Sequence, residues 1–287
     1  RQQRNRETAM IFKGLLVIIA GFLFIFSSGI PMRLISHYKP NYPREGLYWG
    51  IGIWIIAFFV SNFFQNLIRQ IAAAGTLQPN QQSPLTYLIG AVITTLLLQY
   101  GMRLYLKRRS KKGEDLVADG LALGFGVGVI AQVFTGMILI AAGLGVVFQG
   151  AGLHLNLGEV QRNTIDVIFS ENLGNLIFAL LSLILYRIAL LTVSASQGYM
   201  VARSINSKQS WFWLGLATYT AFNWLIFFLQ MLLGEPNPGQ ISLGMTSLLT
   251  SLISTAYYLG VFILGTRWLN GELQSESKKP VKKKRSK

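Results

Sequence analysis

The chain has 287 residues, of which 52% are hydrophobic and only 13% are charged, against about 25% charged residues in ordinary soluble domains. It contains no cysteine, which excludes disulfides, thiolate metal sites and thiol nucleophiles. The net charge of +15 lies mainly between the apolar segments and at the chain ends.

Apolar segments long enough to cross a bilayer, which takes about 20 residues, recur along the whole chain. We expect seven of them, at residues 11–30, 47–68, 85–106, 116–149, 173–202, 211–233 and 242–269. Short polar links join them and leave no room for a soluble domain. The sequence therefore predicts an all-α polytopic membrane protein, with one transmembrane bundle domain over residues 1–270. A low-complexity basic tail follows over residues 271–287.

Basic residues indicate which links face the cytoplasm, because cytoplasmic loops are rich in Lys and Arg. After the third segment comes a group that we call the basic collar: Arg103, Lys107, Arg108, Arg109, Lys111 and Lys112. The tail adds Lys282, Lys283, Lys284 and Arg285, among other basic residues. The 234–241 loop holds no base. We therefore expect a bacterial plasma membrane protein with the collar and C-terminus in the cytoplasm and the N-terminus outside, although three arginines near the N-terminus oppose this orientation.

The collar and tail would face the same side and could serve one of two purposes. Near a membrane surface each base attracts anionic lipid head groups by about 1 kcal/mol. Alternatively, the two basic groups could dock onto an acidic surface of a partner.

The fourth segment is too long for one simple crossing and is rich in glycine. Its glycines are Gly120, Gly124, Gly126, Gly128, Gly136, Gly143 and Gly145. They predict a helix that is broken near Thr135–Gly136 or one that is strongly tilted. Glycine in such helices serves close packing between backbones or marks unwinding around a site.

Arg187 is the most informative polar residue, because it lies near the middle of the fifth apolar segment. A charge at that depth costs several kcal/mol unless it is paired. Asp119 is the acidic partner to consider, and Gln99, Gln132, Tyr219 and Asn223 are polar candidates for a shared interior site. Arg187 could be an internal hydrogen-bond hub, or it could contact an anionic lipid, a cofactor or a group of a partner chain.

The stretch from Gln99 to Gln132 resembles the YhfC-type family of intramembrane metalloproteases, distant relatives of the CAAX-processing and PrsW-type membrane proteases. The resemblance rests on Arg103, on Asp119-Gly120-Leu121-Ala122-Leu123-Gly124, and on Gly126 and Gly128. In this family two acids precede the Arg, and a His and a Glu follow among the glycines. Here those positions hold Gln99, Tyr100, Val127 and Ala131.

Later in the chain the resemblance continues without the expected catalytic residues. A family His falls at or near Arg187, and a family His-x-x-x-Asp becomes Tyr219-x-x-x-Asn223. The resemblance therefore implies a protease frame that has lost its catalysts. A zinc site needs three or four His, Cys, Asp or Glu ligands, and the two histidines, His37 and His154, fall in loops. We expect no catalytic residue, no metal and no cofactor.

These observations favour a non-catalytic membrane subunit. It would be an accessory or scaffold protein that packs against other integral membrane subunits and the lipid bilayer, in an assembly such as a respiratory or photosynthetic complex. Two alternatives stay open. One is an intramembrane hydrolase of the YhfC and CAAX-protease type, and the other is a small-solute transporter built on the fourth segment and Arg187.

Overall fold

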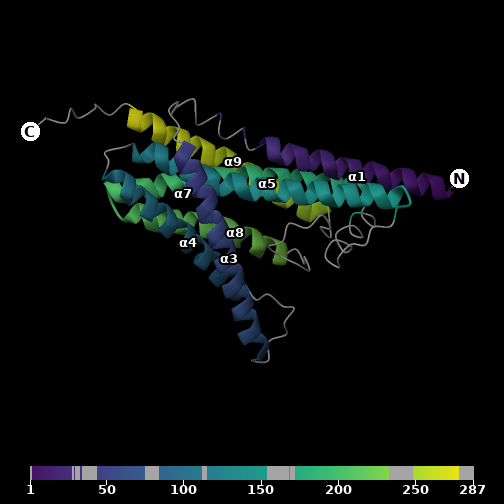
Figure 1. The fold of residues 1–287 in the computed structure, drawn as a ribbon, viewed down its shortest axis with the longest axis horizontal. Coiled ribbons are helices and arrows are strands. Elements are labelled where there is room, and N and C mark those ends of the chain that lie inside the picture. Colours follow the sequence, from purple (N-terminus) through teal and green to yellow (C-terminus); the bar gives the residue numbers. More distant parts are fainter. Residues whose placement is uncertain are drawn as a thin grey trace, which may run out of the picture.

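The computed structural model describes residues 2–27, 29, 33, 44–74, 84–111, 115–153, 168, 172–232 and 248–277. The described residues form helices and short turns and contain no strand. The helices are α1 (Gln2–Ser27), α3 (Arg44–Ala74), α4 (Pro84–Ser110), α5 (Leu116–Gly150), α7 (Leu173–Asn206), α8 (Ser210–Leu232) and α9 (Leu248–Ser277). Each of these 7 helices contains a stretch long and apolar enough to cross a membrane. The prediction of an all-α fold is confirmed for the described residues (Figure 1), and seven helices of this length and composition fit a multi-pass membrane protein.

The seven helices run in alternating directions along the chain. α1 is antiparallel to α5, because Gly14 lies against Gly143 and Gly21 lies against Gly136. α7 and α9 are parallel, since Tyr186 contacts Tyr258 near one end and Tyr199 bonds Glu272 near the other. The described start of α1 and the end of α9 consequently lie at opposite ends of the molecule (Figure 1).

α5 is the central helix of the bundle and packs against α1, α3 and α7 (Figure 1). It begins at a local capping signal, in which the Asp115 carboxylate accepts from the backbone N–H groups of Val117 (3.1 Å) and Ala118 (3.3 Å). Such a cap satisfies backbone donors that the first helical turn leaves without partners. The helix then runs for 35 residues, a length of about 52 Å at 1.5 Å per residue.

The second half of α5 meets α1 through matched glycines. A Cβ added at Gly136 would lie 2.8 Å from the carbonyl oxygen of Gly21, and one at Gly143 would lie 2.7 Å from that of Gly14. Real Cβ atoms essentially never come this close to backbone. The two backbones are therefore in direct contact, which only glycine permits.

The first half of α5 makes the same kind of contact on two further sides. Towards α7, a Cβ at Gly120 would lie 2.5 Å from the carbonyl oxygen of Gly198, and one at Gly124 would lie 2.8 Å from Cα of Ala195. Towards α3, a Cβ at Gly126 would lie 2.9 Å from Cα of Gly50. α5 thus makes close backbone contact with three helices, α1, α7 and α3, and we call these three interfaces the glycine seams of α5.

The predicted break near Thr135–Gly136 is absent, because α5 is continuous from Leu116 to Gly150. Thr135 donates its hydroxyl proton to the Ala131 carbonyl within the same helix (2.9 Å). Gly136 lies in the seam with α1. The glycines of this segment serve close packing rather than unwinding.

α9 also differs from its predicted bounds. The apolar segment was expected to end at residue 269, whereas the described helix, which runs from Leu248, continues to Ser277. Beyond the apolar part, Leu269 and Leu273 remain buried in a cluster with Tyr199 and Phe125. Packing of this one buried face therefore stabilises the helix where its sequence becomes polar.

Candidate functional site

Arg187 lies deep in α7, about 21 Å from the start and about 27 Å from the end of its apolar span. The side chain is partly buried, and its Nε is fully buried without a hydrogen-bond partner in the structure. The guanidinium carbon lies 5.0 Å from the centre of the Tyr186 ring. Tyr219 and Tyr258 are its other charged or ionisable neighbours.

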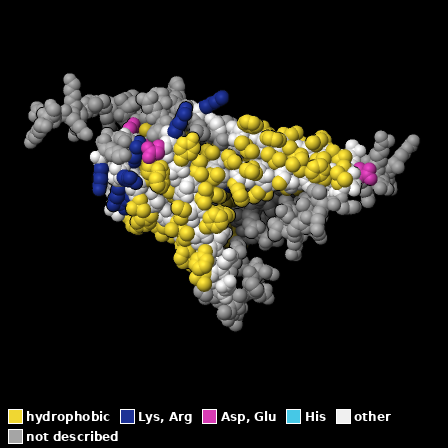
Figure 2. Space-filling view, in the orientation of Figure 1, with side chains coloured by type: hydrophobic (Ala, Val, Ile, Leu, Met, Phe, Trp, Pro, Cys, Tyr) yellow, Lys and Arg dark blue, Asp and Glu magenta, His cyan; other side chains and the backbone are white. Residues whose placement is uncertain are grey.

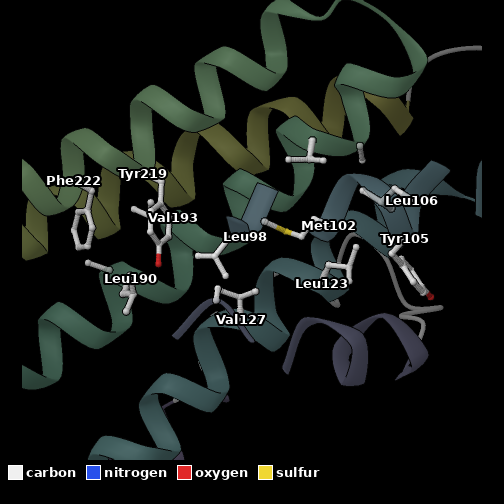
Figure 3. Packing of buried hydrophobic residues seen from close by; sticks show 14 of the residues in the cluster. Leu98, Met102, Tyr105, Leu106, Leu123, Val127, Leu190, Val193, Tyr219 and Phe222 are labelled. Atoms are coloured by element: carbon white, nitrogen blue, oxygen red, sulfur yellow. The ribbon is translucent and has the colours of Figure 1, made fainter. Parts of the chain in front are cut away.

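Three tyrosines neighbour this guanidinium, Tyr186, Tyr219 and Tyr258, and two more lie beside those three, Tyr87 and Tyr257. We call these five residues, which come from four helices, the tyrosine cluster. The Tyr186 ring stacks on Phe222, with centroids 5.8 Å apart, and meets the Tyr258 ring edge-on at 5.1 Å. Figure 3 shows Tyr219 and Phe222 on α8 beside Leu190 and Val193 of α7.

Not every hydroxyl of the tyrosine cluster has a hydrogen-bond partner in the structure. Tyr257 donates to the Phe222 carbonyl (3.1 Å), whereas the buried Tyr258 hydroxyl has no hydrogen-bond partner in the structure. The cluster thus offers Arg187 aromatic faces and neutral hydroxyls.

Asp119, the acidic partner considered for Arg187, is paired elsewhere. Arg109 Nε donates to an Asp119 carboxylate oxygen at 3.2 Å, and Arg109 Nη1 donates to Glu45 at 3.1 Å. The Asp119 side chain is 2% exposed. Its neighbour Gly120 faces Gly198 of α7, about 16 Å along that helix from Arg187. Arg109 of α4 therefore joins Asp119 of α5 and Glu45 of α3 at one end of the bundle.

Gln99 of α4 forms two hydrogen bonds with the backbone of α8. With the amide oxygen and nitrogen assigned from their surroundings, the nitrogen donates to the Phe212 carbonyl (3.1 Å) and the oxygen accepts from the Leu216 N–H (2.6 Å). In a regular helix those two backbone groups bond each other. The fully buried amide therefore spans one turn of α8, against the small surface of Gly215.

Gln132 of α5 forms hydrogen bonds with the last turn of α1. Its Nε2 donates to the Phe24 carbonyl (2.6 Å) and contacts the Ser27 hydroxyl (2.5 Å). The last four carbonyls of a helix lack intrahelical partners, and α1 ends at Ser27. Gln132 thus adds a donor from α5 to a buried carbonyl of α1 that also accepts from the Ser27 hydroxyl (2.9 Å).

The expected common polar interior is not formed by these residues. Asn223 donates its amide to the Tyr219 carbonyl within α8 (2.9 Å), and Gln99 and Gln132 serve separate helix pairs. Of the predicted interior residues, the structure brings only Tyr219 to Arg187.

The basic collar lies at the end of the bundle where α4 ends and α5 begins. Lys107, Arg108 and Lys111 are exposed, and the Arg103 guanidinium lies 5.1 Å from the centre of the Phe212 ring. In Figure 2, Lys and Arg side chains gather at this end, and apolar side chains cover most of the remaining described surface. Lys112, Lys282, Lys283, Lys284 and Arg285 fall outside the described residues.

A cavity that the sequence did not reveal lies between α3, α4 and α8. It has a volume of about 180 Å³. It is lined by Trp54, Ala57, Phe58, Ser61, Asn62, Thr94, Leu98 and Tyr219. Two polar interruptions of apolar segments, Ser61-Asn62 and Thr94-Thr95, were the available signal, but they lie far apart in the sequence.

The described part of the chain holds no group of three or more His, Cys, Asp or Glu side chains that could bind a metal ion. His37 and His154 lie outside that part. Neither a family model, nor a curated protein sequence, nor a solved structure matches this chain. The relationship to YhfC-type proteases therefore stays a prediction from the residues quoted above.

Proposed function

We propose that the protein is a non-catalytic integral membrane subunit of a larger assembly, and that Arg187 pairs with a carboxylate on a transmembrane helix of a partner. The observation that carries the proposal is a guanidinium at mid-span with no carboxylate partner among the described residues.

The energetic argument starts from the cost of the charge. A mid-membrane Arg costs several kcal/mol unless it is paired. The ring of Tyr186 at 5.0 Å returns about 2 kcal/mol when such a contact is desolvated, and the other tyrosines are neutral. An acid supplied by a partner would both neutralise the charge and accept its hydrogen bonds.

Arg187 lies where such a partner could reach it. Towards the start of α7, Ile177 and Leu181 are 40% and 47% exposed, whereas the helix beyond Arg187 is almost entirely buried. The partly exposed arginine therefore marks the point where α7 enters the core. The apolar surface around Arg187 could contact either lipid or a partner helix. The charge favours a partner helix, because a partner can supply a carboxylate.

The resemblance supports the absence of catalysis. Val127 and Ala131 occupy the positions of the family His and Glu, and they are 1% and 5% exposed. Val127 packs in the main hydrophobic cluster with Leu98, Leu123 and Val193 (Figure 3). A buried apolar environment at these positions suits a packing role.

The proposal also includes the orientation in the membrane. The collar would face the cytoplasm of a bacterial cell and bind anionic head groups or an acidic partner surface, with the C-terminus on the same side. The end of α7 and the start of α8 lie at this end and add Arg203 and Lys208. At the opposite end, the described residues between the start of α5 and the start of α7 include no Lys or Arg, but the start of α1 lies at that end too and holds Arg4, Arg6 and Lys13.

The test is affinity purification of the tagged full chain after extraction in mild detergent. We expect partners in stoichiometric amounts, lost with Arg187→Leu and retained with Arg187→Lys. Lys208→Leu, which removes an exposed charge at the membrane edge, is the matched control and should retain them. A chain that purifies alone, or Arg187→Leu with full partner stoichiometry, contradicts the proposal.

The same preparation separates the alternatives. Bound zinc together with hydrolytic activity lost on chelation would establish the hydrolase. Solute uptake by the purified chain in vesicles would establish the transporter. That alternative was based on a broken fourth span, and α5 is continuous.

A further inference from the structure

The cavity between α3, α4 and α8 has the features of a small-molecule site, since such sites combine apolar walls with a few convergent polar groups. One wall is aromatic: the Trp54 and Phe58 rings stack with centroids 5.1 Å apart and an interplanar angle of 18°. Ala57 and Leu98 continue the apolar lining and are 2% and 1% exposed.

The polar part of the cavity is formed by hydroxyl and amide groups. The Thr94 hydroxyl lies 2.9 Å from Ser61 Oγ and 2.8 Å from the Gly90 carbonyl. The Thr94 hydroxyl has one proton for these two acceptors. When it donates to Ser61 Oγ, the Ser61 proton is available to a ligand, and when it donates to the Gly90 carbonyl, Ser61 donates to Thr94. Asn62 uses one amide proton for the Phe58 carbonyl (2.8 Å) and keeps the second. Tyr219 of the tyrosine cluster lines the wall formed by α8.

The volume limits the ligand to about one ring. A cavity of about 150 Å³ lined by apolar side chains binds benzene, and this one measures about 180 Å³. The difference accommodates a few substituents. Phe58 is 39% exposed and Asn62 is exposed, so a compound dissolved in the bilayer could enter from the side of α3.

We propose that this cavity binds a lipid-soluble, single-ring compound that carries a hydrogen-bond acceptor, of the chemical class of a benzoquinone. A hydrocarbon chain cannot accept from the Ser61 and Asn62 donors, and it would leave the second Asn62 amide proton without a partner, which is costly within a membrane. A planar ring with carbonyl oxygens stacks on the aromatic wall and accepts from those donors. The site is independent of any partner subunit.

The test measures binding of 2,3-dimethyl-1,4-benzoquinone to the purified full chain in detergent micelles by titration calorimetry, with empty micelles as blank. ortho-Xylene supplies the same ring without oxygen. We expect saturable quinone binding, with xylene binding at least about five-fold more weakly, because one hydrogen bond contributes about 1 kcal/mol.

Two variants locate the site. Ala57→Leu fills the cavity and should abolish binding. Ser61→Ala removes a hydroxyl that can donate to the ligand and should weaken binding about five-fold. Thr218→Val is the matched control, because the Thr218 hydroxyl bonds only the Leu214 carbonyl of its own helix on the exposed face of α8. It should bind as the unchanged protein does.

Four results overturn the proposal. They are xylene binding as tightly as the quinone, equal affinities of Ser61→Ala and Thr218→Val, saturable binding that persists in a folded Ala57→Leu variant, and displacement of the quinone by palmitate at equal affinity. The last result would assign the cavity to a lipid acyl chain. If Ala57→Leu fails to fold, the comparison of Ser61→Ala with Thr218→Val decides.

Discussion

The seam between α5 and α7 makes a sharp prediction about a single methyl group. Gly124→Ala places a Cβ 2.8 Å from Cα of Ala195, whereas carbon atoms in ordinary contact lie about 3.5–4.0 Å apart. The two helices must separate locally by about 1 Å, since the obstacle is backbone and cannot rotate away. A gap of that size forfeits up to about half of the dispersion energy of each contact it opens.

The expected loss of stability is about 1–2 kcal/mol. Overpacking a well-packed core costs about 1–3 kcal/mol, and alanine returns about 0.5–1 kcal/mol through its better helix propensity. Gly52→Ala is the matched control, because nothing lies within 4 Å of the added Cβ. That variant should gain the propensity term alone, so the two substitutions should change stability in opposite directions.

The assay is reversible unfolding in mixed micelles by titration with sodium dodecyl sulfate, followed by far-ultraviolet circular dichroism. A difference of about 1.4 kcal/mol is a ten-fold change in the unfolding equilibrium, so the midpoints should separate clearly. If Gly124→Ala is as stable as Gly52→Ala, the backbones are not in contact and the seam does not exist.

Three further predictions concern the interhelical contacts of Gln132 and Arg109 and the orientation of the chain in the membrane. Gln132→Ala should lower the free energy of unfolding by about 1–2 kcal/mol, because it removes the hydrogen bond from α5 to the buried Phe24 carbonyl of α1, while Thr135→Ala on the next turn should change it little; equal effects would contradict a role of Gln132 in joining the two helices. Arg109→Leu should cost about 3 kcal/mol because a buried carboxylate of α5 loses its ion-pair partner, and neutralising that carboxylate as well should restore most of the loss. In this cysteine-free chain, Lys111→Cys should react with impermeant maleimide only from the cytoplasmic side and Leu153→Cys only from the other; labelling of both from one side would refute the alternation.

Hydropathy was sufficient to predict the helices, because a bilayer demands long apolar segments with internally bonded backbones. It was a poor guide to their ends. α9 continues to Ser277 through Asn270, Gly271 and Glu272, and Tyr199 donates to the Glu272 carboxylate at 2.9 Å. A tertiary contact of this kind has no trace in a local average of hydrophobicity.

The role of the glycines was predictable only in comparison with a second helix. Gly136 and Gly143 alone are compatible with a break or with packing. Gly14 and Gly21 repeat the same spacing in the first apolar segment, and the structure shows these pairs in contact. The matched spacing was therefore a usable signal of an antiparallel seam.

The candidate site was predictable residue by residue but not as an arrangement. Arg187 could be identified because its charge is expensive at that depth. The rotation of each helix about its axis decides which neighbour an amide meets, and apolar segments carry little information about it. Gln99 therefore turned out to face α8 and Gln132 to face α1, while the aromatic neighbours of Arg187 came from helices far apart in sequence.

The central position of α5 fixes the order in which the protein can assemble during synthesis. Among the described residues α1 packs on α5 and, less extensively, on α7, and it hardly touches α3 or α4. α1 leaves the ribosome before α5 and, among the described residues, has no extensive docking surface until α5 has emerged, so it must wait in the lipid while α3 and α4 are inserted. Arrival of α5 brings α1 and α3 together, and its remaining seam then receives α7. The chain is in this sense built outward from its middle, so a nascent protein truncated before Leu116 would keep α3 and α4 paired and leave α1 unattached.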